Sequence, residues 1–337
     1  MNLKPKRMTA MRTLKLLSAA LVAACLIAAP ASAQAKFPER PIRVLIPFAA
    51  GGGTDIVARI LGQRLGEQIG QAVIVDAKPG AGGAIAVAEL MRAAPDGHTL
   101  MIATSTHAVL PIVSNLAWHP SNDFTLIAAV YSYPFVLVTN SENVARFGSL
   151  AQFLTHVRAN PGKINWGSSG VGGPQHLVGE HFNRLAKLAM VHVPYKGNGP
   201  MMQALRANEV QVAFDTQTLM LPQIQEGRLK ALAITSDKRS ARLPDTPTFR
   251  EAGMADFSIE ITNFILAPKG TPPAIQAELN RQIAAALEHK EVRDKLVGFG
   301  HSVPLAGDNT VAAVKGHIDS FHATYGRLVR ELGLADK

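Results

Sequence analysis

Three consecutive glycines stand where a short apolar run ends and a helical pattern begins. Gly51–Gly53 follow the run Val44–Ile46 and precede Val57, Leu61 and Leu65, which share one face of a helix. A helix start exposes backbone N–H groups that lack intrahelical partners, and it carries the positive end of the helix dipole. Because such a start binds anions well, the loop predicts a site for a carboxylate or a phosphate.

The same arrangement recurs three times further along the chain. Glycine-rich stretches at 78–83, 167–174 and 195–200 each follow a short apolar run and precede a helical pattern. Ordinary turn chemistry explains any one of these stretches taken alone. Four of them at strand-to-helix joints favour a shared cleft that binds a small anion.

Several side chains near these loops could contact such a ligand. Thr54 offers a hydroxyl donor or caps the first helix, whereas Asp55 would repel an anion and is expected to cap unless the ligand carries an amine. Asp215 ends an apolar run, where it could accept from a ligand amine or a water, or cap the next helix. The candidate ligand-binding residues are Phe48, Ala50, Gly51, Gly52, Gly53, Thr54, Asp55, Ser105, Ser168, Ser169, Gly170, Gly172, His176, Tyr195, Gly197 and Asp215.

The sequence contains no complete catalytic, cofactor-binding or metal-binding pattern. The serines of the third glycine-rich stretch lack the flanking glycines of a nucleophile elbow. Ile85 stands where a dinucleotide-binding loop requires its third glycine. His176, Glu180 and His181 share a helical segment, but their spacing is one residue too long for the zinc-protease order. We therefore expect no catalytic residue, no cofactor and no metal.

Short apolar runs alternate with helical patterns along most of the chain. This alternation predicts an α/β fold in which most strands are parallel and helices flank the sheets. The expected strands are 42–46, 73–76, 99–103, 134–139, 190–194, 210–214 and 229–235. The expected helices are 55–69, 84–94, 149–159, 175–188, 199–207, 273–289 and 311–332.

The alternation lapses twice, and the lapses predict the domain organisation. Each includes or is followed by an apolar run, Phe135–Val138 or Phe264–Ala267, which we interpret as a crossover between two lobes. We predict that lobe 1 comprises 34–138 and 262–337 and that lobe 2 comprises 139–261. Two crossing strands make a hinge, and ligands favour the cleft between two such lobes.

The first 33 residues have the pattern of a secretory leader. Five basic residues precede the apolar segment Leu16–Ala29, and Ala31–Ala33 forms a small-residue cleavage site. We expect the mature protein to begin near Gln34 and to reside in a bacterial periplasm. Cys25 lies in a sequence similar to a lipoprotein signal, but the apolar residues that follow it favour simple cleavage.

The composition after the leader excludes several classes of protein. Cys25 is the only cysteine, so a chain cleaved after residue 33 has no disulfide and depends on its core for stability. The formal net charge is +9, but five of these charges lie in the leader, which leaves +4. Because no Lys/Arg run of the nucleic-acid type follows, we expect no nucleic-acid partner.

A set of short motifs extends along the whole mature chain. The motifs are Pro41–Val44, Gly51–Asp55, Pro79–Gly83, Pro95–Leu100, Ser168–Gly170, His176–Glu180, His192–Gly197 and Ala267–Pro272. Together they resemble the Bug-type substrate-binding receptors of tripartite tricarboxylate transporters. The resemblance implies a two-lobe periplasmic binding fold that closes on a small organic anion. It also implies a membrane partner with one large and one small integral subunit, and a ligand carboxylate bound through backbone groups and bridging waters by loops 48–55, 168–172 and 195–200.

We therefore expect a monomeric periplasmic receptor that captures a small carboxylate and delivers it to a membrane transporter without catalysis. One alternative is a periplasmic hydrolase or lyase acting on an organic acid, with His107 or His176 beside Asp215 as its titratable pair. Another is a ligand-sensing partner of a signalling protein. Asn198-Gly199 departs from the family pattern in a ligand loop, so the identity of the ligand does not follow from the resemblance.

Overall fold

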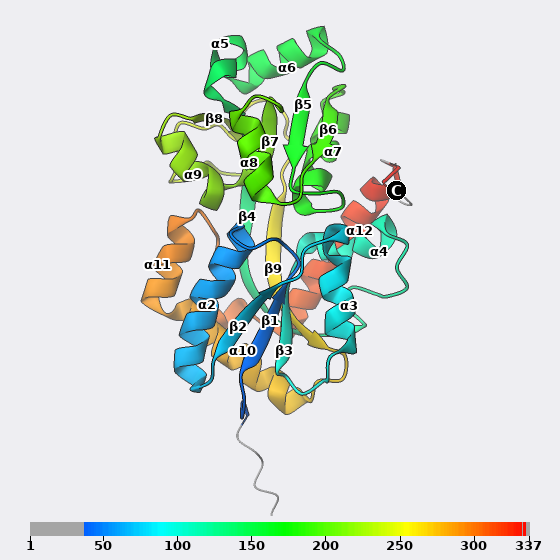
Figure 1. The fold of residues 1–337 in the computed structure, drawn as a ribbon, viewed down its shortest axis with the longest axis vertical. Coiled ribbons are helices and arrows are strands. Elements are labelled where there is room, and N and C mark those ends of the chain that lie inside the picture. Colours follow the sequence, from blue (N-terminus) through cyan, green and yellow to red (C-terminus); the bar gives the residue numbers. More distant parts are fainter. Residues whose placement is uncertain (1–36, 332, 335–337) are drawn as a thin grey trace, which may run out of the picture. The chain divides into compact units, whose positions relative to one another are not determined.

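The computed structural model describes residues 37–331, 333 and 334 (Figure 1). The residues from Arg40 onward form one compact unit, and the fold below is that of this unit. The predicted leader, with Cys25 and the cleavage site before Gln34, lies outside the described residues. Among the helices of the described part, none has both the length and the apolar character needed to cross a membrane.

The first of two sheets contains the strand order β2-β1-β3-β9-β4. β1 pairs in parallel with β2 and β3, whereas β9 runs antiparallel to β3 and β4. Helices α2 and α10 pack against each other, and α10 and α12 both contact β4. The strands are β1 (Ile42–Ile46), β2 (Val73–Ala77), β3 (Thr99–Thr104), β4 (Phe124–Asn140) and β9 (Glu260–Pro268). The helices are α2 (Gly53–Ile69), α3 (Ala84–Arg92), α4 (Leu110–Val113), α10 (Pro273–Glu288), α11 (Lys290–Gly298) and α12 (Val311–Glu331).

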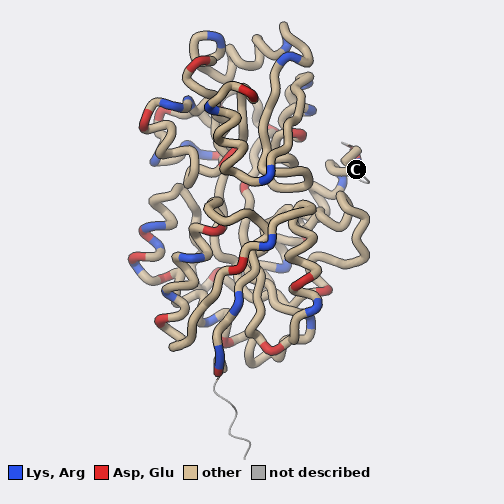
Figure 2. The backbone as a smooth tube through the Cα atoms, viewed as in Figure 1, with Lys and Arg blue, Asp and Glu red and all other residues tan. Residues whose placement is uncertain are grey.

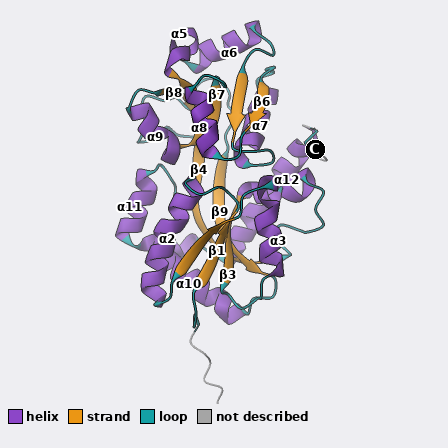
Figure 3. Cartoon of the chain, in the orientation of Figure 1, coloured by secondary structure: helices purple, strands orange, loops and turns teal. Residues whose placement is uncertain are grey.

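The second sheet is built from the middle of the chain. β5 pairs in parallel with β6 and β7, whereas β4 runs antiparallel to β7 and β8. Figure 3 shows the strands of both sheets with helices on their outer sides. The strands are β5 (Asn165–Ser168), β6 (Val191–Pro194), β7 (Val212–Thr216) and β8 (Leu229–Ile234). The helices are α5 (Val144–Phe147), α6 (Leu150–Ala159), α7 (Pro174–Leu185), α8 (Asn198–Arg206) and α9 (Gln217–Gln225). Four short 3₁₀ helices complete the description: η1 (Ala81–Gly83), η2 (Ser105–Ala108), η3 (Ser141–Asn143) and η4 (Ala306–Asp308).

Strand β4 is shared by the two sheets. Its residues Phe124–Pro134 pair with β9, and its residues Phe135–Asn140 pair with β7 and β8. The change of partner lies between residues 134 and 135, and the lobe boundary near 138 stays a prediction. The boundary near 262 and the division into lobes stay predictions, because β9 pairs along its whole length with strands of the first sheet.

Each sheet has its own apolar core. In the first, Leu45, Ile46 and Leu61 are at most 4 % exposed. In the second, Phe182 and Phe214 belong to a cluster of aromatic rings whose centroids lie 5.5 Å apart for this pair. Burying one such side chain contributes roughly 1.5–3 kcal/mol, so these clusters hold the sheets from which the glycine-rich loops extend.

Each predicted strand and helix overlaps an observed one, but the structure also contains elements that were not predicted, among them α5 and α11. All four predicted strand-to-helix joints are present, before α2, α3, α7 and α8. The expected strand 134–139 is the second half of β4, and its first half was not predicted because Pro134 interrupts the apolar run. Helix α9 was also not predicted, since it contains Pro222 in its interior.

Candidate ligand site among the glycine-rich loops

Two adjoining chambers lie among the glycine-rich loops. The outer chamber has a volume of about 440 Å³, and the inner compartment has about 20 Å³, enough for one water molecule. Phe48, Ser169 and Asn198 line both of them. The outer chamber is also lined by Pro47, Ala49, Pro79–Gly83, Gly170, Val171, Gly173 and Tyr195–Gly197. The inner compartment is also lined by Gly52, Gly53, Thr54, Tyr131, Tyr133, Phe135, Pro174, Gln175, Asp215, Thr216 and His301.

Three helices begin at these chambers without a side-chain cap. The residues before α2, α7 and α8 are Gly52, Gly173 and Gly197, and none of these helix starts receives a side-chain hydrogen bond at its N-cap. Their first-turn N–H groups have no intrahelical acceptors. The positive potential that the sequence predicted for these loops is therefore directed at the chambers.

The glycines also allow loops of the two sheets to approach one another. A Cβ on Gly52 would lie 3.2 Å from Oδ1 of Asn198, and a Cβ on Gly197 would lie 3.1 Å from Cβ of Ala49. Gly197 has a φ of 107°, which glycine adopts readily, but Gly52 has an ordinary φ of −77°. Glycine at position 52 thus provides space rather than an unusual backbone conformation.

Asp55 stabilises the first loop instead of facing the chambers. Its carboxylate accepts from the N–H of Gly51 at 3.0 Å and from Nε of Arg59 at 3.0 Å. Burial raises the pKa of Asp55, but the Arg59 guanidinium and the Gly51 N–H outweigh burial and hold the pKa below its usual value. The N-cap of α2 is Gly52, so the interpretation of Asp55 and Thr54 as N-caps is wrong. Thr54 lines the inner compartment, where its side chain hydrogen-bonds Tyr131.

The two serines of the third loop have different surroundings. Ser168 is fully buried, and its Oγ lies 2.7 Å from Nε2 of His192, outside both chambers. Ser169 lines both chambers, and its Oγ donates to Oε1 of Gln175 at 2.6 Å. Of the pair, only Ser169 is therefore positioned to contact a molecule in the outer chamber.

Asp215 lies at the carboxyl end of β7 and is fully buried. One carboxylate oxygen accepts from Nδ2 of Asn198 at 2.7 Å, and the other accepts from the N–H of Thr216 at 2.7 Å. Burial raises the pKa of the Asp215 carboxyl to about 6, although the Thr216 N–H and the side chains of Asn198 and Gln175 act in the opposite direction. Asp215 thus organises loops that begin α7, α8 and α9.

Comparisons with known proteins show the family of the chain. Residues 57–334 match the family described as the tripartite tricarboxylate transporter family receptor. The chain belongs to that receptor family. The receptor is 34% identical to the protein BugT of Bordetella pertussis over 310 residues, which cover 91% of this chain and 93% of BugT.

Solved structures give the receptor its fold class. It is similar to the periplasmic binding protein BugD, with a TM-score of 0.83 and 30% identity over 89% of this chain and 99% of the other. It is also similar to MatC from Rhodopseudomonas palustris, solved with bound malate, with a TM-score of 0.82 and 32% identity over 87% of this chain and 100% of MatC. The predicted two-lobe α/β fold of periplasmic binding proteins is confirmed.

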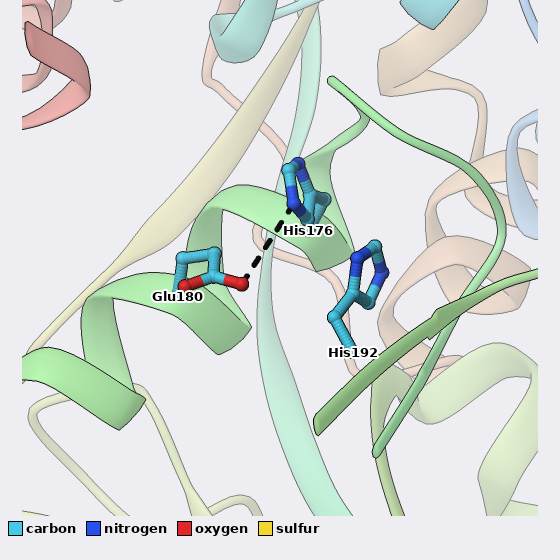
Figure 4. A group of neighbouring side chains, drawn as sticks. All are labelled: His176, Glu180 and His192. Atoms are coloured by element: carbon cyan, nitrogen blue, oxygen red, sulfur yellow. Dashed lines mark ion pairs between the residues drawn. The ribbon is translucent and has the colours of Figure 1, made fainter. Parts of the chain in front are cut away.

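One cluster in the receptor has the residue types of a metal site. His176 and Glu180 on α7 lie beside His192 on β6, and one ligand atom from each lies within 4.8 Å of the others (Figure 4). The two imidazole rings are stacked, with centroids 4.4 Å apart and planes 25° apart. Near-parallel rings direct their in-plane lone pairs side by side rather than towards one ion at about 2.0–2.1 Å. In this arrangement the cluster packs as a stack on Trp166.

Seven of the predicted ligand residues line neither chamber. His176 accepts from the N–H of Gly172 at 3.1 Å, so these two residues order the third loop. Ser105 accepts from the N–H of Thr262 at 2.9 Å and joins η2 to β9. The seven are Ala50, Gly51, Asp55, Ser105, Ser168, Gly172 and His176.

Several chamber residues of the receptor were not among the predicted ligand residues. Tyr131, Tyr133 and Phe135 alternate along β4, and this period of two places them on one face. This alternation of aromatic residues could have been recognised if the predicted strand had been extended to residues before Pro134. The sequence predicts a glycine-rich loop at 78–83, but its residues are not among the candidate ligand residues. Pro79–Gly83 nevertheless line the outer chamber. His301 follows α11 and carries no local signal.

The titratable pairs named for the enzyme alternative, His107 or His176 beside Asp215, do not line a common chamber. His107 is buried and stacks on Trp118 with ring centroids 4.5 Å apart, and burial lowers its pKa to about 3. Neither His107 nor His176 lines a chamber with Asp215. The hydrogen-bond partners of Asp215 are two side-chain amides and the backbone N–H and hydroxyl of Thr216, none of which acts as a general base near neutral pH.

Proposed function

We propose that the receptor binds a small organic carboxylate in the outer chamber and delivers it to integral membrane transporter subunits. The observation that carries this proposal is the convergence of two uncapped helix starts, those of α7 and α8, on a cavity of about 440 Å³, with the uncapped start of α2 at the adjoining inner compartment. Lys196 is the one charged residue among those that line this cavity. A site with backbone donors and a single cation matches a small anion. The malate bound to the related MatC supports the same ligand class.

The proposed contacts come from loops on both sheets. The proposed direct contacts are the predicted residues that line the outer chamber: Phe48, Ser169, Gly170, Tyr195 and Gly197. Gly52, Gly53, Thr54 and Asp215 line the inner compartment, where one water can connect them to the ligand. Residues 34–138 and 262–337 would move as one lobe and 139–261 as the other, and the loops would close over the ligand. The close approach of Gly52 to Asn198 supports closure at this position.

Ligand-dependent stabilisation tests the proposal directly. Purified receptor is melted in the presence of a panel of mono-, di- and tricarboxylic, aromatic and amino acids. A true ligand raises the melting temperature in a concentration-dependent way, because it binds only the folded chain. Calorimetric titration then gives the affinity. If no member of the panel and no molecule retained through purification binds, the proposed function is wrong.

The receptor is proposed to bind its ligand without converting it. The alternative, a hydrolase or lyase, predicts that a bound acid changes mass on incubation with the protein. Mass spectrometry of each stabilising acid after prolonged incubation separates the two functions. Recovery of unchanged ligand agrees with a receptor, whereas a product that forms in proportion to protein concentration establishes an enzyme.

Location and partners of the receptor are also part of the proposal. The leader is expected to be cleaved near Gln34, which releases a monomer into the periplasm. Sequencing of the amino end of protein from a periplasmic extract checks cleavage, and sedimentation checks the oligomeric state. Uptake of radiolabelled ligand by cells with and without the gene checks delivery. A lipidated form that begins at Cys25 would contradict the first expectation.

A further inference from the structure

Asp215 is the one carboxyl group among the residues that line the inner compartment. It is fully buried, while the same lining contains no lysine and no arginine. The loops around it are the ones expected to attract an anion. A buried carboxylate at this place therefore competes electrostatically with the ligand, and this conflict calls for a physical explanation.

A chain of hydrogen bonds connects Asp215 with the outer chamber. The side chain of Gln175 hydrogen-bonds the Asp215 carboxylate, and Oε1 of Gln175 accepts from Oγ of Ser169 at 2.6 Å. Since Oε1 is occupied by the serine hydroxyl, the amide nitrogen donates to the carboxylate. The single hydrogen of Ser169 thus points inward, and only lone pairs of its oxygen remain for the outer chamber.

Protonation of Asp215 reverses this chain. A neutral carboxyl group can donate to Oε1 of Gln175 once the amide has turned over. The amide nitrogen then donates to Oγ of Ser169. The serine hydrogen is released, and it can be donated to an oxygen atom in the outer chamber.

We propose that Asp215 is a proton-controlled switch, so that the receptor takes up a carboxylate together with one proton from solvent. The ionised form presents Ser169 as an acceptor, which an anion avoids, and the protonated form presents it as a donor. This inference rests on the proposed function and deepens it, because it adds a regulating group to the same site.

The groups that face Asp215 leave its charge without a counter-ion. Tyr131 and Tyr133 face it from β4, and burial raises the pKa of both phenols, so that they are neutral at pH 7. His301, from the segment after α11, is also neutral there because burial lowers its pKa to about 3. A ligand carboxylate in the adjoining outer chamber therefore places a second negative charge near Asp215, whose own compartment has no cation.

The remaining neighbouring charges lie outside this compartment. Asp55 on α2 is bound by Arg59 and the Gly51 N–H, and Lys196 lines only the outer chamber. From α8, Asn198 contributes a neutral amide. The nearby charge of a ligand raises the pKa of Asp215 above its unliganded value of about 6. At pH 7.5 the Asp215 carboxyl is thus mostly ionised in the free receptor and protonated in the complex.

Proton uptake on binding is the direct measurement. Malate is the first probe, since it is fully ionised at pH 7.5 and cannot itself accept the proton. Calorimetric titrations in phosphate and in Tris, which differ in ionisation enthalpy, give the number of protons bound per ligand. The expected uptake is close to one for the wild type and close to zero for Asp215→Asn. The variant Asp256→Asn, at an exposed position outside both chambers, is expected to behave as the wild type.

The pH dependence of affinity provides a second readout. Only the protonated fraction of the free receptor binds, so the association constant is expected to fall by up to tenfold per pH unit above pH 6. Asp215→Asn removes this slope. Ser169→Ala is expected to cost about tenfold in affinity at every pH from 6 to 8.5 and to keep the slope, because only the protonated receptor, in which the hydroxyl can be donated, binds the ligand.

The outcomes separate this inference from the proposed function. If malate and every other carboxylate in the panel fail to bind, both are wrong. If a carboxylate binds wild-type receptor without proton uptake, or if its affinity does not fall as the pH rises above 6, only the switch is wrong. The buffer comparison on the wild type decides the matter even where Asp215→Asn does not fold.

Discussion

The glycine-rich loop of the first sheet and those of the second sheet give their buried carboxylates opposite kinds of partner. In the first, Asp55 is paired with Arg59 and accepts from the Gly51 N–H, so its charge is satisfied within one turn. In the second, Asp215 is fully buried and has only neutral donors. In the first region an ion pair neutralises the carboxylate, whereas the second region holds an uncompensated charge beside the chambers.

This difference shows that the two sides of a cleft can contribute to anion recognition in different ways. The first loop supplies uncapped N–H groups whose strength does not change between pH 5 and pH 9. The second supplies side chains whose donor or acceptor character follows the state of Asp215. Figure 2 shows acidic and basic residues interspersed along the chain in this view, so the division does not come from a charged face.

The strongest test of the first region fills the space at Gly52. A valine there meets Oδ1 of Asn198, because even the Cβ lies 3.2 Å from it. Overpacking of this kind costs about 1–3 kcal/mol, so Gly52→Val is expected to weaken ligand binding by roughly ten- to a hundredfold. Calorimetric titration measures the loss.

The matched control is Gly307→Val, at an exposed glycine with an ordinary φ and no heavy atom within 4 Å of the added Cβ. The melting temperature of Gly307→Val is expected to stay close to that of the wild type, whereas overpacking lowers that of Gly52→Val as well. Unchanged affinity in Gly52→Val means that the two loops do not need to approach each other for binding.

Acid stability separates folding from binding in the region between the sheets. His301 contacts Oγ1 of Thr218 at 2.9 Å and is neutral when folded, with a pKa lowered by burial to about 3. Its stabilising contribution is present above pH 6.5, the unfolded value, and is lost as the pH falls towards 3. The free energy of unfolding is expected to decrease by about 1.4 kcal/mol per pH unit from this group.

Urea unfolding at pH 7, 6 and 5 measures this slope, and His301→Gln, which retains a donor and an acceptor, is expected to reduce it. Stability and affinity then move in opposite directions, since binding strengthens as the pH falls. If the free energy of unfolding and the ligand affinity changed with pH in the same direction, one group would control both.

Removal of the first region's charge is expected to have a smaller effect. Asp55→Asn keeps an acceptor for the Gly51 N–H but loses the ion pair with Arg59, whose side chain is 57 % exposed. We expect the free energy of unfolding to fall by about 0.5–1 kcal/mol at pH 7. Because the pKa of Asp55 is depressed in the folded state, this contribution is present above its unfolded pKa and fades as acid protonates it.

Denaturant titration measures the stability change, and calorimetry across pH provides the comparison. The slope of affinity against pH is expected to match that of the wild type. A flattened slope in Asp55→Asn would transfer the control of binding from the second region to the first.

The smallest expected effect belongs to Lys196. It is the one cation among the residues that line the outer chamber, and it lies on a loop of the second sheet. Exposed charge pairs contribute about 0–1 kcal/mol, so Lys196→Met is expected to weaken binding by no more than about fivefold. The loss is expected to shrink as salt is raised from 50 to 500 mM, because screening weakens the attraction. A larger loss that does not depend on salt would identify a direct, desolvated contact.

The positions of the loops could be predicted from sequence because local patterns determine them. Glycines after the runs ending at Ile46 and Trp166 mark strand-to-helix joints, and both joints are present. The family motifs carried the fold, because six of the eight lie within residues 57–334, which match the receptor family. What neither pattern contains is which side of each loop faces the chambers.

The misplaced and missing site residues show why the rest could not be predicted. Ser168 and Ser169 are neighbours of identical type, and only the position of His192, two elements away, turns the first one inward. Tyr131 and His301 meet Asp215 through the packing of β4 and the segment after α11. Such contacts join residues about 80 or more positions apart, so no local period reveals them.

The sharing of β4 between two sheets has a consequence for the order in which the chain can fold. β4 lies between β9 and β7, and β9 is supplied only by Glu260–Pro268. A chain emerging from its amino end can form β1, β2 and β3 early, but the junction β3-β9-β4 must wait until nearly the whole second sheet has been delivered. Pairing over such separations is slow because a long loop must close first. The first three strands therefore remain an unfinished sheet with an open edge at β3 for most of synthesis. A factor bound to the growing chain would have to shield that edge from pairing with other strands.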